Sequence, residues 1–155
     1  MNNSNSGAGR RAIIAAIAVL ALGTVSDAQA AETPPTLQGV KVISAQEGKP
    51  MLDKGVAFID ARVAAEYAEK TIKGAKNVPY REKSAKSVDF DRAQDQFDLG
   101  KLPNDKAAPV VFFCNAGECW KSYKAAVLAR DAGYKQVYWL RGGIPEWTSK
   151  GLPTQ

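Results

Sequence analysis

The residues best placed to do chemistry in this sequence are its two cysteines, Cys114 and Cys119. Cys114 directly follows an apolar run, 110–113, and opens a short loop, 115–120, after which a helical pattern begins. A buried strand followed by a loop and a helix delivers a side chain to the carboxyl edge of a parallel sheet. Backbone N–H groups of the loop and helix N-terminus then point at the thiol and lower its pKa. The layout therefore predicts a nucleophilic thiolate at Cys114.

The sequence contains no histidine, which narrows the chemistry open to this thiolate. Cys–His and Ser–His catalytic pairs are excluded, and so is a zinc site with histidine ligands. Two thiols alone make a poor zinc site, so we expect neither a metal nor another cofactor. Activation of Cys114 must then come from backbone dipoles and cations, of which Lys121 is the nearest in sequence.

The loop after Cys114 holds the other candidate site residues. Asn115, Ala116 and Gly117 are small enough to let the backbone wrap around one sulfur, with Gly117 free to take a positive φ. Glu118 places a carboxylate beside the thiolate and should repel a dianionic substrate. The remaining candidates at the start of the helix are Trp120, Lys121 and Ser122.

Strand and helix patterns alternate along the chain, which is typical of a parallel α/β sheet with its site at the carboxyl ends of the strands. The segments with strand character are 37–43, 56–59, 110–113 and 136–140. The segments with helical character are the one after a Ser44–Glu47 capping box, 63–70, around 90–97, 121–131 and around Trp147. Asp60, Cys114 and Arg141 each end a strand, so we expect them at one edge of the sheet. The polar stretch 81–108 gives the weakest prediction.

The amino terminus has the pattern of an export signal. A pair of arginines precedes an apolar run, 12–22, whose length suits a signal-peptide core and is short for a membrane span. Small residues at 28 and 30, Ala28 and Ala30, give the small-x-small pattern that is typical of a cleavage site. We expect 1–30 to be a cleaved signal peptide, although an uncleaved membrane anchor is the alternative, and 31–36 to be a Pro-rich leader. The mature protein would be periplasmic or secreted, with no membrane association.

Charge and length point to one small domain without nucleic-acid partners. The 155 residues carry 21 basic and 16 acidic side chains, a net charge of +5, and these are scattered without a basic run. That pattern gives no sign of nucleic-acid binding. The chain after residue 30 is long enough to build its own core, so the two cysteines need not be a disulfide framework.

Four segments together resemble the single-domain rhodanese sulfurtransferases. They are 58–62, 72–79, the strand-borne Cys114 loop and 140–147. The resemblance covers 37–153 and implies a single rhodanese-like α/β domain with a central parallel five-stranded sheet flanked by helices. It also implies that Cys114 cycles between thiolate and persulfide. The sulfur would come from a small sulfur-containing anion or a protein persulfide and pass to a thiol acceptor.

The resemblance also suggests which residues support the loop. Asp60 and Arg62 match a pair of positions at the end of a strand, where we expect mutual anchoring and loop support. Arg141, Gly142 and Gly143 belong to the last matching segment, and the two glycines should allow the backbone to approach the loop closely. Trp147, in the same segment, is expected in the core.

The loop departs from the usual family pattern. Cys119 stands where an arginine or another polar residue is common, and Trp120 follows where a serine or threonine is common. Lys121 and Ser122 could replace the basic and hydroxyl side chains if the loop is two residues longer than usual. Phosphatase relatives require an arginine at the position of Trp120, which argues against phosphatase activity. With Glu118 nearby, we expect thiosulfate to be a poorer sulfur donor than polysulfide or a protein persulfide.

Cys119 leaves three interpretations open. It could attack a Cys114 persulfide, expel sulfide and leave an internal disulfide that a periplasmic reductant must open. The pair could be a thiol–disulfide redox element without sulfur traffic, or Cys119 could only staple or fill the loop. A disulfide requires the two Cα atoms within about 7 Å, which the sequence does not decide. A non-catalytic rhodanese module that binds a partner protein is a further alternative.

Overall fold

Five parallel strands form one sheet in the order β1-β5-β4-β2-β3, in a computed structural model that describes residues 31–155. The predicted signal peptide lies outside the described residues. β4 is central, and its residues 110–113 stand opposite 137–140 of β5. The strands are β1 (Lys41–Ile43), β2 (Ala57–Asp60), β3 (Lys76–Asn77), β4 (Pro109–Phe113) and β5 (Gln136–Leu140).

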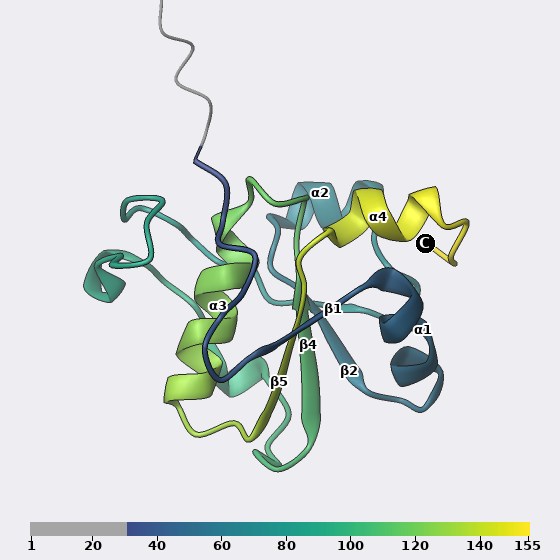
Figure 1. Ribbon diagram of the computed structural model, residues 1–155, viewed down its shortest axis with the longest axis horizontal. Helices are drawn as coiled ribbons and strands as arrows, with labels where there is room; N and C mark the ends of the chain where they lie inside the picture. Colours follow the sequence, from purple (N-terminus) through teal and green to yellow (C-terminus); the bar gives the residue numbers. More distant parts are fainter. Residues whose placement is uncertain (1–30) are drawn as a thin grey trace, which may run out of the picture.

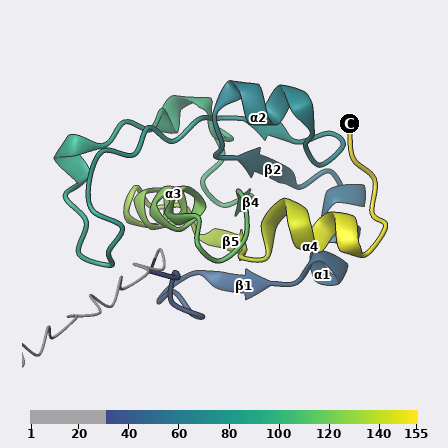
Figure 2. The same ribbon diagram turned by 90° about the horizontal axis from the view of Figure 1, so that it is seen from above.

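Helices cover both faces of this sheet (Figures 1 and 2). α3 packs on one face and α1 and α4 on the other, while α2 lies at the carboxyl end of the strands. The helices are α1 (Ala45–Asp53), α2 (Ala64–Glu69), α3 (Trp120–Asp131) and α4 (Gly143–Ser149). No helix within residues 31–155 is long and apolar enough to cross a bilayer. The single-domain α/β fold with a flanked five-stranded parallel sheet is thus confirmed.

The strand that carries the cysteine loop is buried on both faces, as expected for the centre of a parallel sheet. Val110 and Phe112 of β4 belong to the core beneath α3. Val111 and Phe113 belong to the second core, beneath α1 and α4, together with Trp147. The side chains of residues 110–113 are all fully buried, so the end of this strand is held rigidly between two cores.

Two sequence predictions fail locally. The segment 37–43 is not one strand, because Gly39 takes a φ of 75° and turns the chain between Leu37 and Val40. The helix expected around 90–97 is a single 3-10 turn, η1 (Arg92–Gln94). There, the Asp91 side chain accepts a hydrogen bond from the backbone N–H of Ala93, a local bond that competes with a continuing helix.

The polar stretch that gave the weakest prediction contains an excursion, residues 81–96. Its two ends pair through reciprocal backbone hydrogen bonds between Arg81 and Gln96, of 2.9 and 3.0 Å. Phe90 at its middle is buried, and Arg92 forms an ion pair of 2.6 Å with Asp131 at the end of α3. The excursion therefore returns onto α3, the helix that follows the cysteine loop. A second 3-10 turn, η2 (Leu99–Lys101), leads on toward β4.

Candidate active site

Cys114 lies directly after β4, at the carboxyl edge of the sheet, and its side chain is fully buried. Its carbonyl oxygen accepts a hydrogen bond of 3.1 Å from the backbone N–H of Ile144 in α4. Gly143, with a φ of 56°, passes so close that a Cβ atom there would overlap this carbonyl oxygen. The backbone on both sides of the sulfur is thereby fixed, and Gly143 has the close approach that the sequence predicted for it.

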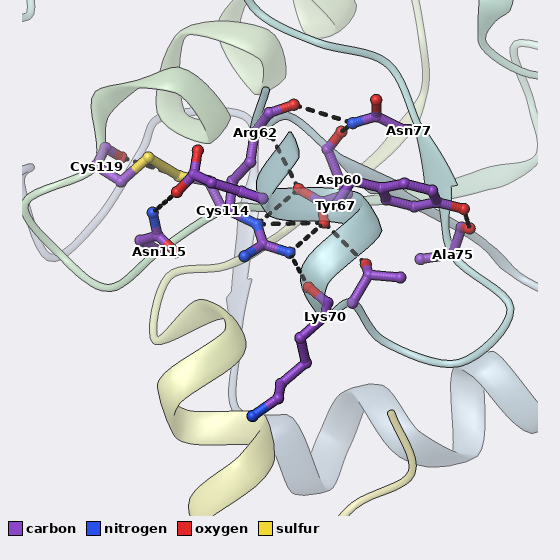
Figure 3. Close-up of polar contacts among 11 residues, drawn as sticks. Asp60, Arg62, Tyr67, Lys70, Ala75, Asn77, Cys114, Asn115 and Cys119 are labelled. Carbon is purple, nitrogen blue, oxygen red and sulfur yellow. Dashed lines mark hydrogen bonds and ion pairs between the residues drawn. A yellow bond between two sulfur atoms is a disulfide. The ribbon is translucent and has the colours of Figure 1, made fainter. Parts of the chain in front are cut away.

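The two cysteines form a disulfide (Figure 3), with their Cα atoms 6.4 Å apart. Cys119 is the residue immediately before α3 and caps its N-terminus, without a side-chain hydrogen bond. Its backbone N–H donates to the carbonyl oxygen of Ala116 at 3.0 Å, which turns the loop back toward the strand. The loop therefore does curl enough to bridge the pair, a point the sequence left open.

A hydroxyl group faces the sulfur of Cys114. Ser122 Oγ lies 2.9 Å from Cys114 Sγ, and Trp139 Nε1 donates a hydrogen bond of 3.0 Å to the same oxygen. Because the indole N–H occupies an acceptor site on Ser122, the serine proton is free to be donated to sulfur. A hydrogen bond to the charged form favours that form, so this arrangement stabilises a Cys114 thiolate. The predicted hydroxyl side chain thus contacts the predicted nucleophile.

A pocket of about 270 Å³ opens beside the loop. Cys119 lines it, whereas Cys114 does not. The other residues of its wall are Glu82, Lys86, Asn115, Glu118, Trp120 and Lys121. Two lysines and two glutamates thus share the mouth, and those of the excursion, Glu82 and Lys86, were not predicted. Within residues 31–155, no three His, Cys, Asp or Glu side chains gather as metal ligands.

Gly117 differs from its prediction. Its φ is not positive. A Cβ atom at this position would instead lie 2.9 Å from Nη2 of Arg141, so the glycine makes room for a guanidinium group. Arg141 in turn faces the leader, since Nη2 donates to the carbonyl oxygen of Thr33 at 2.7 Å and Nε to that of Pro34 at 3.2 Å. Arg141 supports the loop from outside and is absent from the pocket wall.

The leader, residues 31–36, is bound to the cysteine loop. The backbone N–H and the hydroxyl of Thr33 both donate to the carbonyl oxygen of Gly117, at 2.8 and 2.7 Å. Trp120 Nε1 donates to the carbonyl oxygen of Ala31 at 2.7 Å. Thr33 is 2% exposed. The leader is therefore one wall of the loop, a contact for which the sequence carries no signal.

The first of two buried ionic clusters lies at the end of β2 (Figure 3), and we name it the Asp60 cluster: Asp60, Arg62 and Thr71. Arg62 Nη2 is 2.7 Å from Asp60 Oδ2, and Thr71 Oγ1 donates to the same oxygen at 2.8 Å. The guanidinium group also donates to the carbonyl oxygen of Lys70. Nε and Nη2 of Arg62 thus both donate to neighbouring groups, as expected for mutual anchoring with Asp60.

The loop is tied to the same side of the molecule through one amide. Asn115 Nδ2 donates a hydrogen bond of 2.7 Å to Glu66 Oε1 of α2 (Figure 3). On the opposite side, Gly142 immediately precedes α4 and lets the side chain of Glu146 fold back over it. Glu146 Oε1 then accepts a hydrogen bond of 2.8 Å from the backbone N–H of Ala45 at the start of α1.

The second buried ionic cluster was missed by sequence reasoning, and we name it the Lys124 cluster: Lys124, Glu82, Ser84, Asp95 and Tyr80. Lys124 on α3 is 0% exposed, and its Nζ lies 2.9 Å from Glu82 Oε2 and 3.5 Å from Asp95 Oδ2. It also donates to Ser84 Oγ at 2.8 Å. The signal that could have found it is a lysine inside the apolar helical run 123–129.

The Lys124 cluster perturbs two titrations. Burial works against the charged form of Asp95, but hydrogen bonds from the side chain and backbone of Ser84 and from the backbone of Lys83 outweigh it. They hold the pKa of this carboxyl well below its usual range. Burial and the hydrogen bond donated to Asp95 raise the pKa of Tyr80 far above its usual value. Asp95 is thus ionised and Tyr80 neutral across the physiological range.

The described residues thus form a parallel α/β domain in which a buried cysteine follows the central strand, with backbone and hydroxyl groups gathered around it. Residues 44–150 match the model of the rhodanese-like domain. The chain belongs to the rhodanese-like domain family.

Relatives and solved structures agree with this membership. Over 116 residues the chain is 32% identical to human thiosulfate:glutathione sulfurtransferase, covering 74% of this chain and 98% of that protein. Over 117 residues it is 29% identical to chloroplastic thiosulfate sulfurtransferase 16 of Arabidopsis thaliana, covering 73% and 91%. The Alr3790 protein of Anabaena sp. superposes with a TM-score of 0.52 at 26% identity, over 72% of this chain and 88% of that one. The polysulfide-sulfur transferase of Wolinella succinogenes shares the fold, with a TM-score of 0.55 at 22% identity over 76% and 79%.

Proposed function

We propose that this protein is a sulfurtransferase that carries a sulfane sulfur as a persulfide on Cys114 and passes it to a thiol. The observation that carries the proposal is the position of Cys114 Sγ, buried at the end of β4 and 2.9 Å from the Ser122 hydroxyl. Support also comes from relatives named as sulfurtransferases, one of which has a thiol, glutathione, in its name.

Sulfur is transferred in two displacements. The Cys114 thiolate attacks the terminal sulfur of the donor, an S–S bond forms, and the remainder of the donor leaves as an anion with the electron pair. An acceptor thiolate then attacks the outer sulfur, and Cys114 leaves again as a thiolate. Alternatively, Cys119 attacks Cys114 Sγ and expels hydrosulfide. That branch yields the internal disulfide, which an external dithiol reductant returns to two thiols.

The charges around the pocket bear on the choice of donor. Glu82 and Glu118 repel an anion in this pocket and Lys86 and Lys121 attract it, so the four side chains offer the two charges of thiosulfate no net attraction. We therefore place polysulfide or a protein persulfide ahead of thiosulfate as donor. The steady-state rates of the reduced protein with each donor, compared at one ionic strength, test this order.

Intact mass tests the proposed function. Reduced protein incubated with polysulfide should gain about 32 Da, the mass of one sulfur atom, and lose it when a thiol is added. Cys114→Ser should abolish the gain, and Cys119→Ser, as the matched control, should retain it. If Cys119→Ser, in which the internal attack is impossible, gains no mass with any sulfane donor, the protein is not a sulfurtransferase, and the binding module for a partner protein becomes the better interpretation.

A second candidate function rests on the disulfide itself. A thiol–disulfide redox protein would exchange electrons through Cys114 and Cys119 without sulfur traffic. In that case the purified protein is about 2 Da lighter than its dithiol form, and it reacts with dithiol reductants while never acquiring sulfur. Equilibration against glutathione buffers would then give a defined reduction potential.

Export is part of the proposal, because disulfides persist in oxidising compartments. We place the mature protein in the periplasm or outside the cell, with a periplasmic reductant as partner for the disulfide. Fractionation of the native host with determination of the mature N-terminus tests this placement. An intracellular protein that retains residues 1–30 would contradict it.

A further inference from the structure

The two sulfurs of the disulfide differ in how they can be reached. Cys114 is 0% exposed, whereas Cys119 is partly exposed and lines the pocket beside the loop. Figure 3 shows Cys119 at the outer end of the bond, away from the sheet. A nucleophile attacks a disulfide along the axis of the S–S bond, from the side opposite the leaving sulfur. Attack from the pocket therefore falls on Cys119.

The two sulfurs also differ as leaving groups. Cys114 Sγ lies 2.9 Å from the hydroxyl of Ser122, which is itself held by Trp139. Within the described residues, the Cys119 side chain has no such hydrogen bond. A thiolate that is stabilised leaves faster in thiol–disulfide exchange. Access and leaving-group stability thus favour the same reaction, in which the nucleophile attacks Cys119 Sγ and Cys114 leaves as a thiolate.

We propose that the oxidised protein has a further activity, the capture of hydrosulfide as a persulfide on Cys119. Hydrosulfide attacks Cys119 Sγ, a new S–S bond forms, and the Cys114–Cys119 bond breaks. The electron pair of the broken bond leaves with Cys114, so the sulfide sulfur is oxidised and the Cys114 sulfur is reduced. The proton of hydrosulfide stays on the outer sulfur until it is lost to water.

The pocket suits this small nucleophile. Hydrosulfide carries one negative charge, and Lys86 and Lys121 at the pocket wall attract it. An acceptor thiolate can then attack the outer sulfur and release Cys119 as a thiolate, which leaves the protein as a dithiol. One disulfide thus converts one sulfide into one transferable sulfane sulfur.

The proposal rests on the disulfide and its surroundings, and not on the sulfane-donor step of the proposed function. The sulfurtransferase test starts from reduced protein and polysulfide. The test of sulfide capture starts from oxidised protein and sodium hydrosulfide. Either can fail while the other succeeds, so the two failures are distinguishable.

Mapping the extra sulfur tests the direction of attack. Oxidised protein is mixed with sodium hydrosulfide, quenched with N-ethylmaleimide at a series of times, and cleaved after Glu118, which separates the two cysteines. At the earliest times we expect about 32 Da of extra mass on the fragment with Cys119, and alkylated Cys114 without it. Extrapolation to zero time removes any later migration between the sulfurs.

Three results would overturn the proposal: extra sulfur on Cys114 at zero time, a disulfide that opens without retaining sulfur, or a disulfide that sulfide does not open. Two variants sharpen the outcome. Ser122→Ala should slow the opening about tenfold, because the Cys114 thiolate loses its hydrogen bond. Lys121→Gln should slow it about two- to fivefold at low salt, and Lys150→Gln, outside the pocket, should leave it unchanged.

Discussion

Two buried ionic clusters lie on either side of the cysteine loop, and they are built in different ways. The Asp60 cluster joins residues two positions apart at the end of β2, and each charge in it meets its opposite. The Lys124 cluster joins α3 to the excursion, and one lysine serves two carboxylates, Glu82 and Asp95. The first is a local clamp, while the second holds a distant segment onto the helix.

The difference teaches where the loop is rigid and where it is adjustable. On the Asp60 side, Asn115 ties the loop to Glu66 by one hydrogen bond. The cluster on this side pairs one arginine, Arg62, with one carboxylate, Asp60. On the Lys124 side, Glu82 belongs to the cluster and to the pocket wall at once. A change in the Lys124 cluster should therefore reach the pocket, whereas a change in the Asp60 cluster should act mainly on stability.

The largest effect on stability is expected at Lys124, whose single charge pairs with two carboxylates. Lys124→Met leaves two carboxylates without their buried cation, and we expect a loss of about 3–5 kcal/mol in the free energy of unfolding. Urea denaturation measures it. Lys49→Met, which breaks the exposed pair with Asp53, is the control and should cost at most about 1 kcal/mol. Equal losses in the two variants would show that the Lys124 cluster contributes nothing special.

The Asp60 cluster should respond less strongly, because the partners of Arg62 include a backbone carbonyl. Asp60→Asn should lower the free energy of unfolding by about 3 kcal/mol, and adding Arg62→Gln should restore part of it because no buried charge is then left alone. Persulfide formation by the folded Asp60→Asn protein should be unaffected. Loss of persulfide formation at unchanged folding would mean that the Asp60 cluster acts on the sulfur directly.

The pH dependence of stability gives a separate test of the Lys124 cluster. The pKa of Asp95 is lower in the folded protein than in the unfolded chain, so its contribution is present above about pH 4 and is lost as the pH falls further. Asp95→Asn should therefore flatten the decline of the denaturation midpoint below pH 4. Asp53→Asn, an exposed carboxylate, should leave the slope as it is. A steep decline in both variants would assign acid lability to other groups.

The smallest effect concerns Ser122, which lies two residues before Lys124 on α3 and faces the sulfur of Cys114. Ser122→Ala removes the hydroxyl 2.9 Å from Cys114 Sγ and should raise the pKa of the thiol in the reduced protein, because the thiolate loses a hydrogen-bond donor. Thiolate absorbance in the ultraviolet, followed against pH, measures the shift. Thr148→Ala, near the carboxyl end of α4, is the control. An unchanged pKa in Ser122→Ala would leave backbone dipoles as the source of activation.

The cysteine loop could be predicted because its parts are contiguous. An apolar strand, Cys114, small residues and a helix follow one another within a short stretch of sequence. The pairing of Asp60 with Arg62 could be predicted for the same reason. By contrast, Lys124 meets Ser84 across 40 positions, and Thr33 meets Gly117 across 84. Such pairings depend on how the elements pack, which periodicity and turn residues do not encode.

Gly117 and the excursion show two further limits. A glycine in a loop can be required by an unusual φ or by a lack of space for a side chain. At Gly117 the reason is space, because Arg141 lies against the position that a Cβ atom would take, and the sequence does not show that contact. The helix expected around 90–97 failed because Asp91 uses its carboxylate on the backbone N–H of Ala93, two residues further on. Polar side chains that bond locally remove the helix without changing the hydrophobic pattern.

The leader bound to the loop has a consequence for where the working molecule begins. The family match starts at residue 44, and the sheet starts at Lys41, yet Ala31 and Thr33 bind the loop that holds the cysteines. A protein trimmed to its sheet and helices would keep the fold and lose one side of its cysteine loop. Affinity tags and fusion partners therefore belong at the carboxyl terminus, because the first residues after the predicted cleavage site already contact the cysteine loop.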